Sequence, residues 1–153
     1  MKMALLALLA FGFQFPGLGE EVNEPPPLPL TQITIPPLFD GEKLQKLDMP
    51  KDGRVELKGW VKNGKATVYT LPVKKGQVAN IAFTATNKAA LLIFFDLARP
   101  DDDAIYSSDL DGRTFKITAQ SDTIWLVRPF FSLIANRRGP GAQYKIDMQL
   151  TPP

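Results

Sequence analysis

The sequence predicts an all-β protein, an antiparallel β-sandwich of about seven to eight strands. Apolar and polar residues alternate over short runs from position 54 onwards, which is the pattern of half-buried strands. Turn residues such as Asn63-Gly64 and Asp111-Gly112 separate these runs. No segment keeps a helical apolar period of about 3.6 residues for three turns. Many short strands with turns between them are typical of two packed sheets.

Seven runs carry this strand pattern, at 55–59, 69–73, 79–85, 89–97, 115–117, 124–128 and 144–150. The run at 89–97 is almost wholly apolar, and we expect it to be covered on both faces. Pro72 lacks an N–H donor inside its run, which favours an edge strand or a bulge. Residues 31–35 alternate and form a further candidate edge strand, whereas 39–50 give no clear pattern.

The N-terminus has the pattern of an export signal. Met1-Lys2 gives a positive start, and residues 3–15 are almost entirely apolar. This run is too short to span a bilayer, which needs about 20 residues, but it suits a secretory signal. Small residues at Gly17 and Gly19 favour cleavage after Gly19. We therefore expect a signal peptide at 1–19 and a periplasmic or secreted protein, the alternative being an N-terminal helix packed on the domain.

A proline-rich segment follows the expected signal peptide. Residues 20–37 read EEVNEPPPLPLTQITIPP, and proline favours an extended backbone over helix. We interpret 20–52 as a spacer or as an extended arm lying on the sandwich. The β-sandwich domain is then expected at 53–151.

The composition excludes several classes of function. The 153 residues contain no cysteine and no histidine, which excludes disulfides, metal sites built on Cys or His, and a Ser-His-Asp triad. Eighteen basic against 16 acidic residues give a net charge of +2, which is too small to indicate nucleic-acid binding. No nucleophile motif or carboxylate pair stands out. We expect a protein that is not an enzyme and uses no cofactor.

One weak metal candidate remains among the acidic residues. Asp101, Asp103, Asp109 and Asp111 lie within eleven consecutive positions, and calcium takes six to eight oxygen ligands from flexible loops. The spacing does not match an EF-hand loop, because no glutamate closes it. The alternative is a solvated loop built from ordinary turn residues.

The strongest candidate for partner binding combines Trp60 and Phe131 with Arg137 and Arg138. Tryptophan and arginine are enriched at binding hot spots, and the two arginines lie in a long connection, 129–143, between two expected strands. Long loops on a rigid sandwich often carry binding residues. The alternative is that Phe130 and Phe131 cap the core while the arginines are solvated.

Six motifs follow one another along the chain. They are Lys58-Gly59-Trp60, Val68-Tyr69-Thr70-Leu71, Val73-Lys74-Lys75-Gly76-Gln77-Val78, Leu126-Val127-Arg128, Asn136-Arg137-Arg138 and Tyr144-Lys145-Ile146-Asp147. The order of runs from Gly59 to Leu150 resembles the bacterial pre-peptidase C-terminal sandwich, and within that group the six motifs are most similar to the periplasmic inhibitors of g-type lysozyme. The resemblance covers about 90 residues.

This resemblance implies an exported, non-catalytic protein that inserts loops into the substrate cleft of a g-type lysozyme. In the family a tyrosine and two arginines contribute to inhibition. The tyrosine position matches Trp60, one arginine matches Arg137, and the other position holds Leu133. The alternative is an accessory β-sandwich module of the pre-peptidase type that binds a cell-envelope component without inhibiting a lysozyme.

Overall fold

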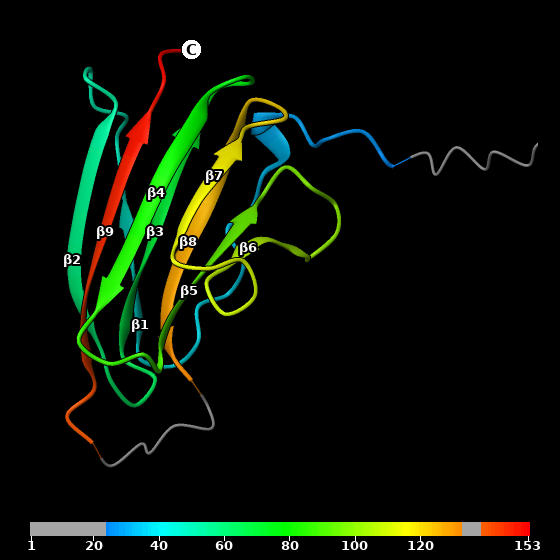
Figure 1. Ribbon diagram of the computed structural model, residues 1–153. Helices are drawn as coiled ribbons and strands as arrows, with labels where there is room; N and C mark the ends of the chain where they lie inside the picture. Colours follow the sequence, from blue (N-terminus) through cyan, green and yellow to red (C-terminus); the bar gives the residue numbers. More distant parts are fainter. Residues whose placement is uncertain (1–23, 133–138) are drawn as a thin grey trace, which may run out of the picture.

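The computed structural model of the chain describes residues 24–132 and 139–153. Within these residues, nine strands form two sheets packed face to face (Figure 1). The prediction of an all-β sandwich is confirmed. The expected signal peptide and the Arg137-Arg138 pair lie outside the described residues. Across the two described ranges, no helix is long and apolar enough to cross a bilayer.

The strands follow one another along the chain with short connections. Their bounds are β1 Glu42–Lys46, β2 Arg54–Val61, β3 Ala66–Val73, β4 Val78–Ala85, β5 Ala90–Asp96, β6 Ala104–Ser107, β7 Thr114–Thr118, β8 Thr123–Phe131 and β9 Ala142–Leu150. The five-stranded sheet has the order β1-β3-β8-β5-β6, and the four-stranded sheet has the order β2-β9-β4-β7. Strands β1 and β6, both edge strands, have no counterpart among the predicted runs.

The core lies between the two sheets, where alternate residues of each strand point inward. Trp125, Phe83 and Phe94 are among its largest fully buried side chains. The Phe94 ring meets Trp125 in a tilted, edge-type contact with centroids 6.2 Å apart, an arrangement that aromatic pairs favour. The inward residues of β5 are buried and its outward residues are half-buried, so this strand is covered completely on its core face and only partly on the other.

A buried pair of tyrosines joins the two sheets. Tyr69 of β3 and Tyr144 of β9 point toward each other, and their hydroxyl oxygens are hydrogen-bonded at 2.7 Å. Each residue is only 3% exposed. Burial, followed by the hydrogen bond to Tyr69, raises the pKa of Tyr144 above its usual value. Each hydroxyl therefore satisfies the other in a place that water does not reach.

Pro72 lies in an interior strand, so the expectation of an edge strand is wrong for β3 as a whole. β3 pairs with β8 on one side and, in parallel, with β1 on the other. The β1 register ends at Thr70, however, and Pro72 has a register partner only on β8, namely Ile124. The side of β3 that faces β1 is thus unpaired at Pro72. The missing N–H of the proline therefore removes no hydrogen bond between these two strands.

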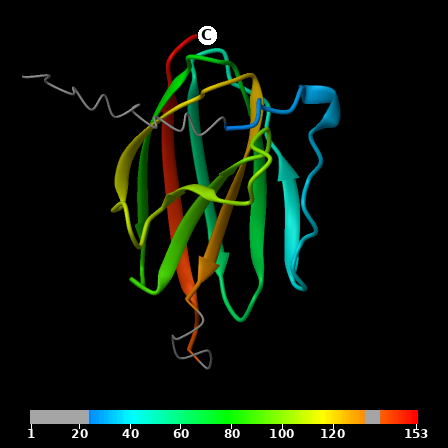
Figure 2. The same ribbon diagram turned by 90° about the vertical axis from the view of Figure 1, so that its right-hand side faces the viewer.

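The segment before β1 runs beside the five-stranded sheet (Figure 2). Its one regular element is a 3-10 turn, Leu30–Gln32, so the predicted strand at 31–35 is wrong. At one end, the Leu28 N–H donates to the Ala98 carbonyl at 2.7 Å. The segment has few amide donors because of its prolines, so it can lie against a sheet without extending its hydrogen-bond ladder.

This segment covers an apolar face that the alternation places outside the core. Val68 of β3 and Leu126 of β8 are completely buried, yet they alternate with core residues and belong to the outer face of their sheet. Leu126 lines a hollow together with Leu28, Pro36 and other residues of the proline-rich segment. The five-stranded sheet is therefore partly covered on its outer face as well, by residues of the predicted spacer or arm.

An ion pair holds the end of this segment and β1 against the sheet. Arg128 of β8 contacts Glu42 of β1 through Nε at 3.0 Å and donates from Nη2 to Oε2 at 3.1 Å. The guanidinium also stacks on the Phe39 ring, 4.6 Å from its centroid. The side chains of Arg128 and Glu42 are only 11% and 4% exposed. We call Phe39, Glu42 and Arg128 the Arg128 clamp.

Removing one partner of the Arg128 clamp should destabilise the fold. Glu42→Ala would leave a nearly buried guanidinium without its counter-charge, and we expect it to lower the free energy of unfolding by about 3 kcal/mol. Urea denaturation of residues 20–153 measures this. The control is Glu56→Ala, which breaks exposed ion pairs to Lys58 and Lys145 and should cause little change. Equal losses in the two variants would contradict a special role for the clamp.

A double-mutant cycle tests the tyrosine pair. Tyr144→Phe leaves the buried Tyr69 hydroxyl without its partner, and we expect a loss of about 1–3 kcal/mol in the free energy of unfolding. Adding Tyr69→Phe removes the orphaned hydroxyl, so the double variant should be no less stable than either single variant. Strictly additive losses, measured by thermal and urea denaturation, would show that the two hydroxyls do not depend on each other.

Candidate partner-binding site

Trp60 lies near the end of β2 on the outer face of the four-stranded sheet. The residue is 47% exposed, whereas its neighbour Val61 is 1% exposed and belongs to the core. Strand alternation explains this difference, because successive side chains point to opposite faces. An indole exposed to this extent is a large apolar surface that contributes little to the core.

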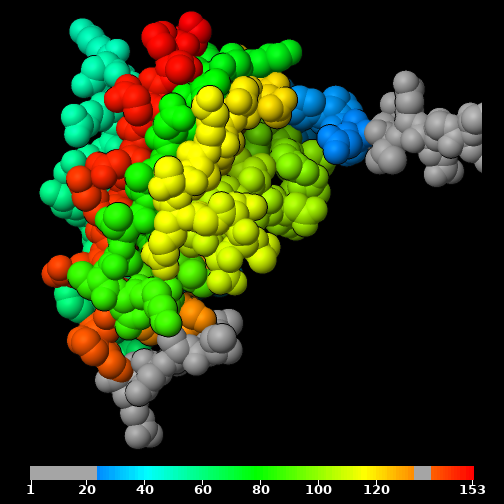
Figure 3. All heavy atoms as spheres, in the orientation of Figure 1, coloured from blue at the N-terminus to red at the C-terminus, as the bar shows by residue number. Residues whose placement is uncertain are grey.

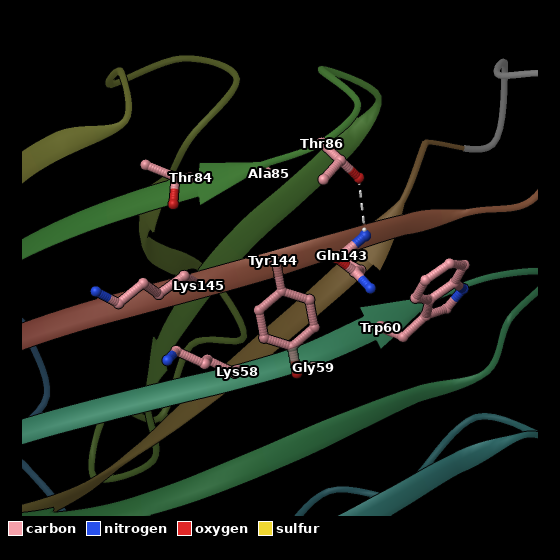
Figure 4. Close-up of a pocket in the computed structure, with 9 residues that line it drawn as sticks. All are labelled: Lys58, Gly59, Trp60, Thr84, Ala85, Thr86, Gln143, Tyr144 and Lys145. Atoms are coloured by element: carbon pink, nitrogen blue, oxygen red, sulfur yellow. Dashed lines mark hydrogen bonds between the residues drawn. The ribbon is translucent and has the colours of Figure 1, made fainter.

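The residue before Trp60 is a glycine for a steric reason. Gly59 is in register with Tyr144 on the adjacent strand β9, and a Cβ added at Gly59 would lie 2.3 Å from the Tyr144 hydroxyl oxygen. The Tyr144 ring therefore lies in the space that a side chain at position 59 would occupy (Figure 4). Any larger residue would displace the ring and disturb the pairing of β2 with β9 beside Trp60.

The far side of Trp60 meets the start of β9. Gly141 has a φ of +81°, and a Cβ there would lie 2.4 Å from the Val61 carbonyl oxygen and 2.7 Å from Trp60 Nε1. The backbone of Gly141 thus lies directly against the indole. A glycine is required here both by the left-handed backbone and by the close contact. Trp60 is therefore packed beside the C-terminal end of the connection between β8 and β9.

A shallow hollow of about 740 Å³ adjoins Trp60. Figure 4 shows its lining residues, which come from three neighbouring strands and the residue after β4: Lys58, Gly59, Trp60, Thr84, Ala85, Thr86, Gln143, Tyr144 and Lys145. The Gln143 N–H donates to Thr86 Oγ1 at 3.0 Å, which ties β9 to the end of β4. In Figure 3 the strips of β2, β9, β4 and β7 lie side by side at this surface. The hollow therefore opens on an uncovered sheet face.

The charges beside the hollow are arranged in ion pairs. Glu56 contacts Lys58 at 3.0 Å and Lys145 at 3.3 Å, and Lys145 also contacts Asp147 at 3.1 Å. The hydrogen bond from Lys58, followed by that from Lys145, lowers the pKa of Glu56, and the hydrogen bond to Asp147 raises that of Lys145. These groups are exposed and screened by water, so we expect them to orient a partner rather than to provide most of its affinity.

Phe131 does not share the hollow beside Trp60. It ends β8, is half-buried, packs against the core and lines a different hollow on the five-stranded sheet. Phe130 lines that second hollow as well. Of the four predicted partner-binding residues, the described part of the chain thus contains Trp60 and Phe131, on different hollows.

Arg137 and Arg138 lie outside the described residues, and only the flanks of their connection are described. On one flank, the Ser132 N–H donates to the Ala89 carbonyl at 2.8 Å. On the other, Gly141 contacts Trp60. These flanks lie at the same end of the sandwich as the turn between β2 and β3 (Figure 1). Trp60 and both ends of the arginine-bearing connection are therefore found at one end of the domain.

The four aspartates of the calcium candidate fall on two separate connections. Asp101 and Asp103 precede β6, whereas Asp109 and Asp111 follow it. Asp101 is paired with Arg99 at 2.9 Å, and Asp111 accepts the Ser107 N–H at 2.8 Å. Among residues 24–132 and 139–153, no three acidic side chains form a group suited to a metal ion. The calcium hypothesis therefore gains no support from this geometry.

The structure gives three residues a role in building the site that the sequence did not predict. Gly59 and Gly141 determine how closely neighbouring groups approach Trp60, and Tyr69 holds Tyr144 in place. The signal for Gly59 was a glycine inside an alternating strand pattern, which often marks a close approach. Nothing in the sequence pointed to the pairing of two tyrosines that lie 75 positions apart.

Comparisons with known proteins place this architecture among solved structures. No family model and no curated protein sequence matches the chain. The structure of Aeromonas hydrophila PliG, a periplasmic inhibitor of g-type lysozyme, is similar, with a TM-score of 0.59 at 18% identity, covering 72% of this chain and 99% of that protein. Salmonella Typhimurium PliG, described in the same terms, gives a TM-score of 0.53 at 19% identity, covering 70% and 99%.

A third similar structure is the pre-peptidase C-terminal domain of collagenase from Bacillus anthracis. Its TM-score is 0.53 at 12% identity, with coverage of 71% of this chain and 96% of that domain. Both groups named by the sequence resemblance therefore appear among the similar structures. At these identities the likeness concerns the fold, and the chain shares the β-sandwich architecture of the g-type lysozyme inhibitors and of the pre-peptidase C-terminal domain.

Proposed function

We propose that this chain is an exported, non-catalytic binding protein that inhibits a g-type lysozyme by inserting one end of its sandwich into the substrate cleft. The observation that carries the proposal is the half-exposed Trp60 packed against Gly141, four residues after Arg137 in the chain. The fold likeness to the PliG inhibitors supports it.

Trp60 is suited to be the apolar anchor of such an interface. An indole offers a large rigid area and an N–H donor, and tryptophan is among the residues most enriched at hot spots. The backbone at Gly141 lies directly against the indole, so part of the side chain is already packed and less conformational freedom is lost when a partner binds. Trp60 would fill a pocket within the lysozyme cleft.

Arg137 and Arg138 would supply the charged part of the interface. Glycosidases use catalytic carboxylates flanking the scissile bond, and arginine forms strong, charge-assisted hydrogen bonds with carboxylates. An arginine inserted into the cleft would pair with these groups and exclude substrate. Inhibition by occlusion requires no chemistry from the inhibitor, which suits a chain with neither cysteine nor histidine.

The second candidate function is an accessory module that binds a cell-envelope component without affecting a lysozyme. It is favoured by the fold likeness to the pre-peptidase C-terminal domain of a collagenase, whose TM-score of 0.53 equals that of the Salmonella inhibitor. The two candidates differ in whether a lysozyme binds.

Lysis of a cell-wall suspension distinguishes these candidates. Purified residues 20–153 are added to g-type, c-type and i-type lysozymes, and we expect selective loss of g-type activity. Trp60→Ala should weaken inhibition about 30-fold, as expected for a hot-spot loss of about 2 kcal/mol. Arg137→Ala should weaken it about tenfold, the effect of losing one charge-assisted hydrogen bond.

Matched controls separate the site from general effects on the fold. Leu110→Ala removes another exposed apolar side chain, 84% exposed in the turn between β6 and β7. Arg54→Ala removes an exposed arginine from the opposite end of β2. Both controls should inhibit like the parent protein. No inhibition of any lysozyme at micromolar protein would refute the proposal and leave the accessory-module alternative.

A further inference from the structure

A second hollow, on the outer face of the five-stranded sheet, has the features of a small-molecule site. Its volume is about 690 Å³, within the range of about 300–1,000 Å³ that ligand pockets occupy. It lies where the proline-rich segment meets the sheet, next to the turn between β2 and β3. Its described lining is Phe39, Glu42, Lys62, Asn63, Gly64, Lys65, Ala66, Ile93, Phe95, Arg128, Phe130, Phe131 and Ser132.

The walls of this hollow are apolar and incompletely covered. Ile93, Phe95 and Phe130 point outward from β5 and β8, and each is half-buried. Phe39 is 67% exposed. Elsewhere on the same sheet face, the proline-rich segment buries Leu126 completely. An aromatic patch left open beside a covered one indicates a site for an apolar ligand.

The polar groups of the hollow carry an excess of positive charge. Glu42 is the one acidic residue in the described lining, and the Arg128 clamp occupies it: Oε1 contacts Arg128 Nε at 3.0 Å, and Oε2 accepts the Phe39 N–H at 2.8 Å. Lys62 and Lys65 are exposed at the turn that borders the hollow. Three cations against one anion give the described lining a formal charge of +2.

We propose that this hollow binds a free fatty acid, with its alkyl chain among the phenylalanines and its carboxylate beside Lys62, Lys65 and Arg128. The aromatic walls match an alkyl chain, and the positive border matches an anionic head group. The concave shape and limited volume fit a single-chain molecule, whereas a protein partner of standard size would cover about 800 Å² of surface. The Arg128 clamp holds Phe39 and β1 in place, so the site is formed before the ligand arrives.

This site is separate from the lysozyme-binding site proposed above. The two hollows share no described lining residue, and Trp60 lies on the four-stranded sheet. Failure of one proposal therefore leaves the other standing. Phe131, which the sequence predicts as a partner-binding residue, lines only this second hollow and is left unchanged in the test.

Isothermal titration of residues 20–153 with decanoate, below its micelle concentration, tests the proposal. The probes 1-decanol and decyltrimethylammonium have the same alkyl chain without a negative charge. We expect one decanoate per chain, and binding about tenfold or more weaker for the two other probes, since the anionic head group contributes a charge-assisted contact. Decanoate binding and lysozyme inhibition are separate measurements, so the effect of Trp60→Ala or Arg137→Ala on inhibition neither supports nor contradicts the fatty-acid site.

Two pairs of charge reversals locate the site. Lys62→Glu with Lys65→Glu changes the described lining from +2 to −2 and should weaken decanoate binding at least about tenfold. Lys74→Glu with Lys75→Glu makes the same change in the turn between β3 and β4, at the other end of the sandwich, and should have little effect.

Absence of decanoate binding, equal affinity for 1-decanol, or equal effects of the two pairs would overturn the proposal. So would sedimentation as a dimer that Phe130→Ser dissociates, because a second copy would then cover the hollow.

Discussion

The pairing of β2 with β9 is the constraint on which the site depends. Gly59 faces Tyr144 in this pairing, and the missing side chain at position 59 leaves room for the tyrosine ring to reach Tyr69 on the opposite sheet. The same register turns Trp60 outward and brings Gly141 against its indole. A shift by one residue would reverse the faces and bury Trp60 in place of Val61. The core hydrogen bond and the exposed tryptophan are thus two consequences of one register.

Side chains alternate between the core and the outer face in both sheets, but the outer faces of the two sheets differ in polarity. The outer face of β2 and β9 is polar and open. Lys145 forms an ion pair across strands with Glu56 and another within its own strand with Asp147. The outer face of β3, β8 and β5 is apolar and needs a cover, which the proline-rich segment provides in part. The Arg128 clamp ends this covered region. The four-stranded sheet therefore has an open polar outer face beside Trp60. The five-stranded sheet has an apolar hollow on its outer face, which the proline-rich segment leaves uncovered.

The strand content was predictable because alternation is a local signal. Each of the seven predicted runs coincides with a strand over most of its length, and the outward direction of Trp60 follows from the inward direction of Val61 beside it. Strand β1, Glu42–Lys46, was missed because its five residues are mostly polar and lie at an edge. The pairing of Glu42 with Arg128 spans 86 positions, and no local pattern reveals such a contact. An arm lying on the sandwich was one of the two interpretations of residues 20–52. Which apolar face this arm covers could not be predicted, because strands far along the chain form that face.

The central claim is that the Trp60 end of the sandwich and a cell-wall saccharide occupy the same cleft of a g-type lysozyme. Competition measures this most directly: the affinity of residues 20–153 for the lysozyme is determined by calorimetry at increasing concentrations of a soluble peptidoglycan fragment. The account predicts that the apparent dissociation constant rises linearly with the concentration of free fragment, as mutually exclusive binding requires. An affinity that is unchanged by saturating fragment would contradict occlusion of the cleft.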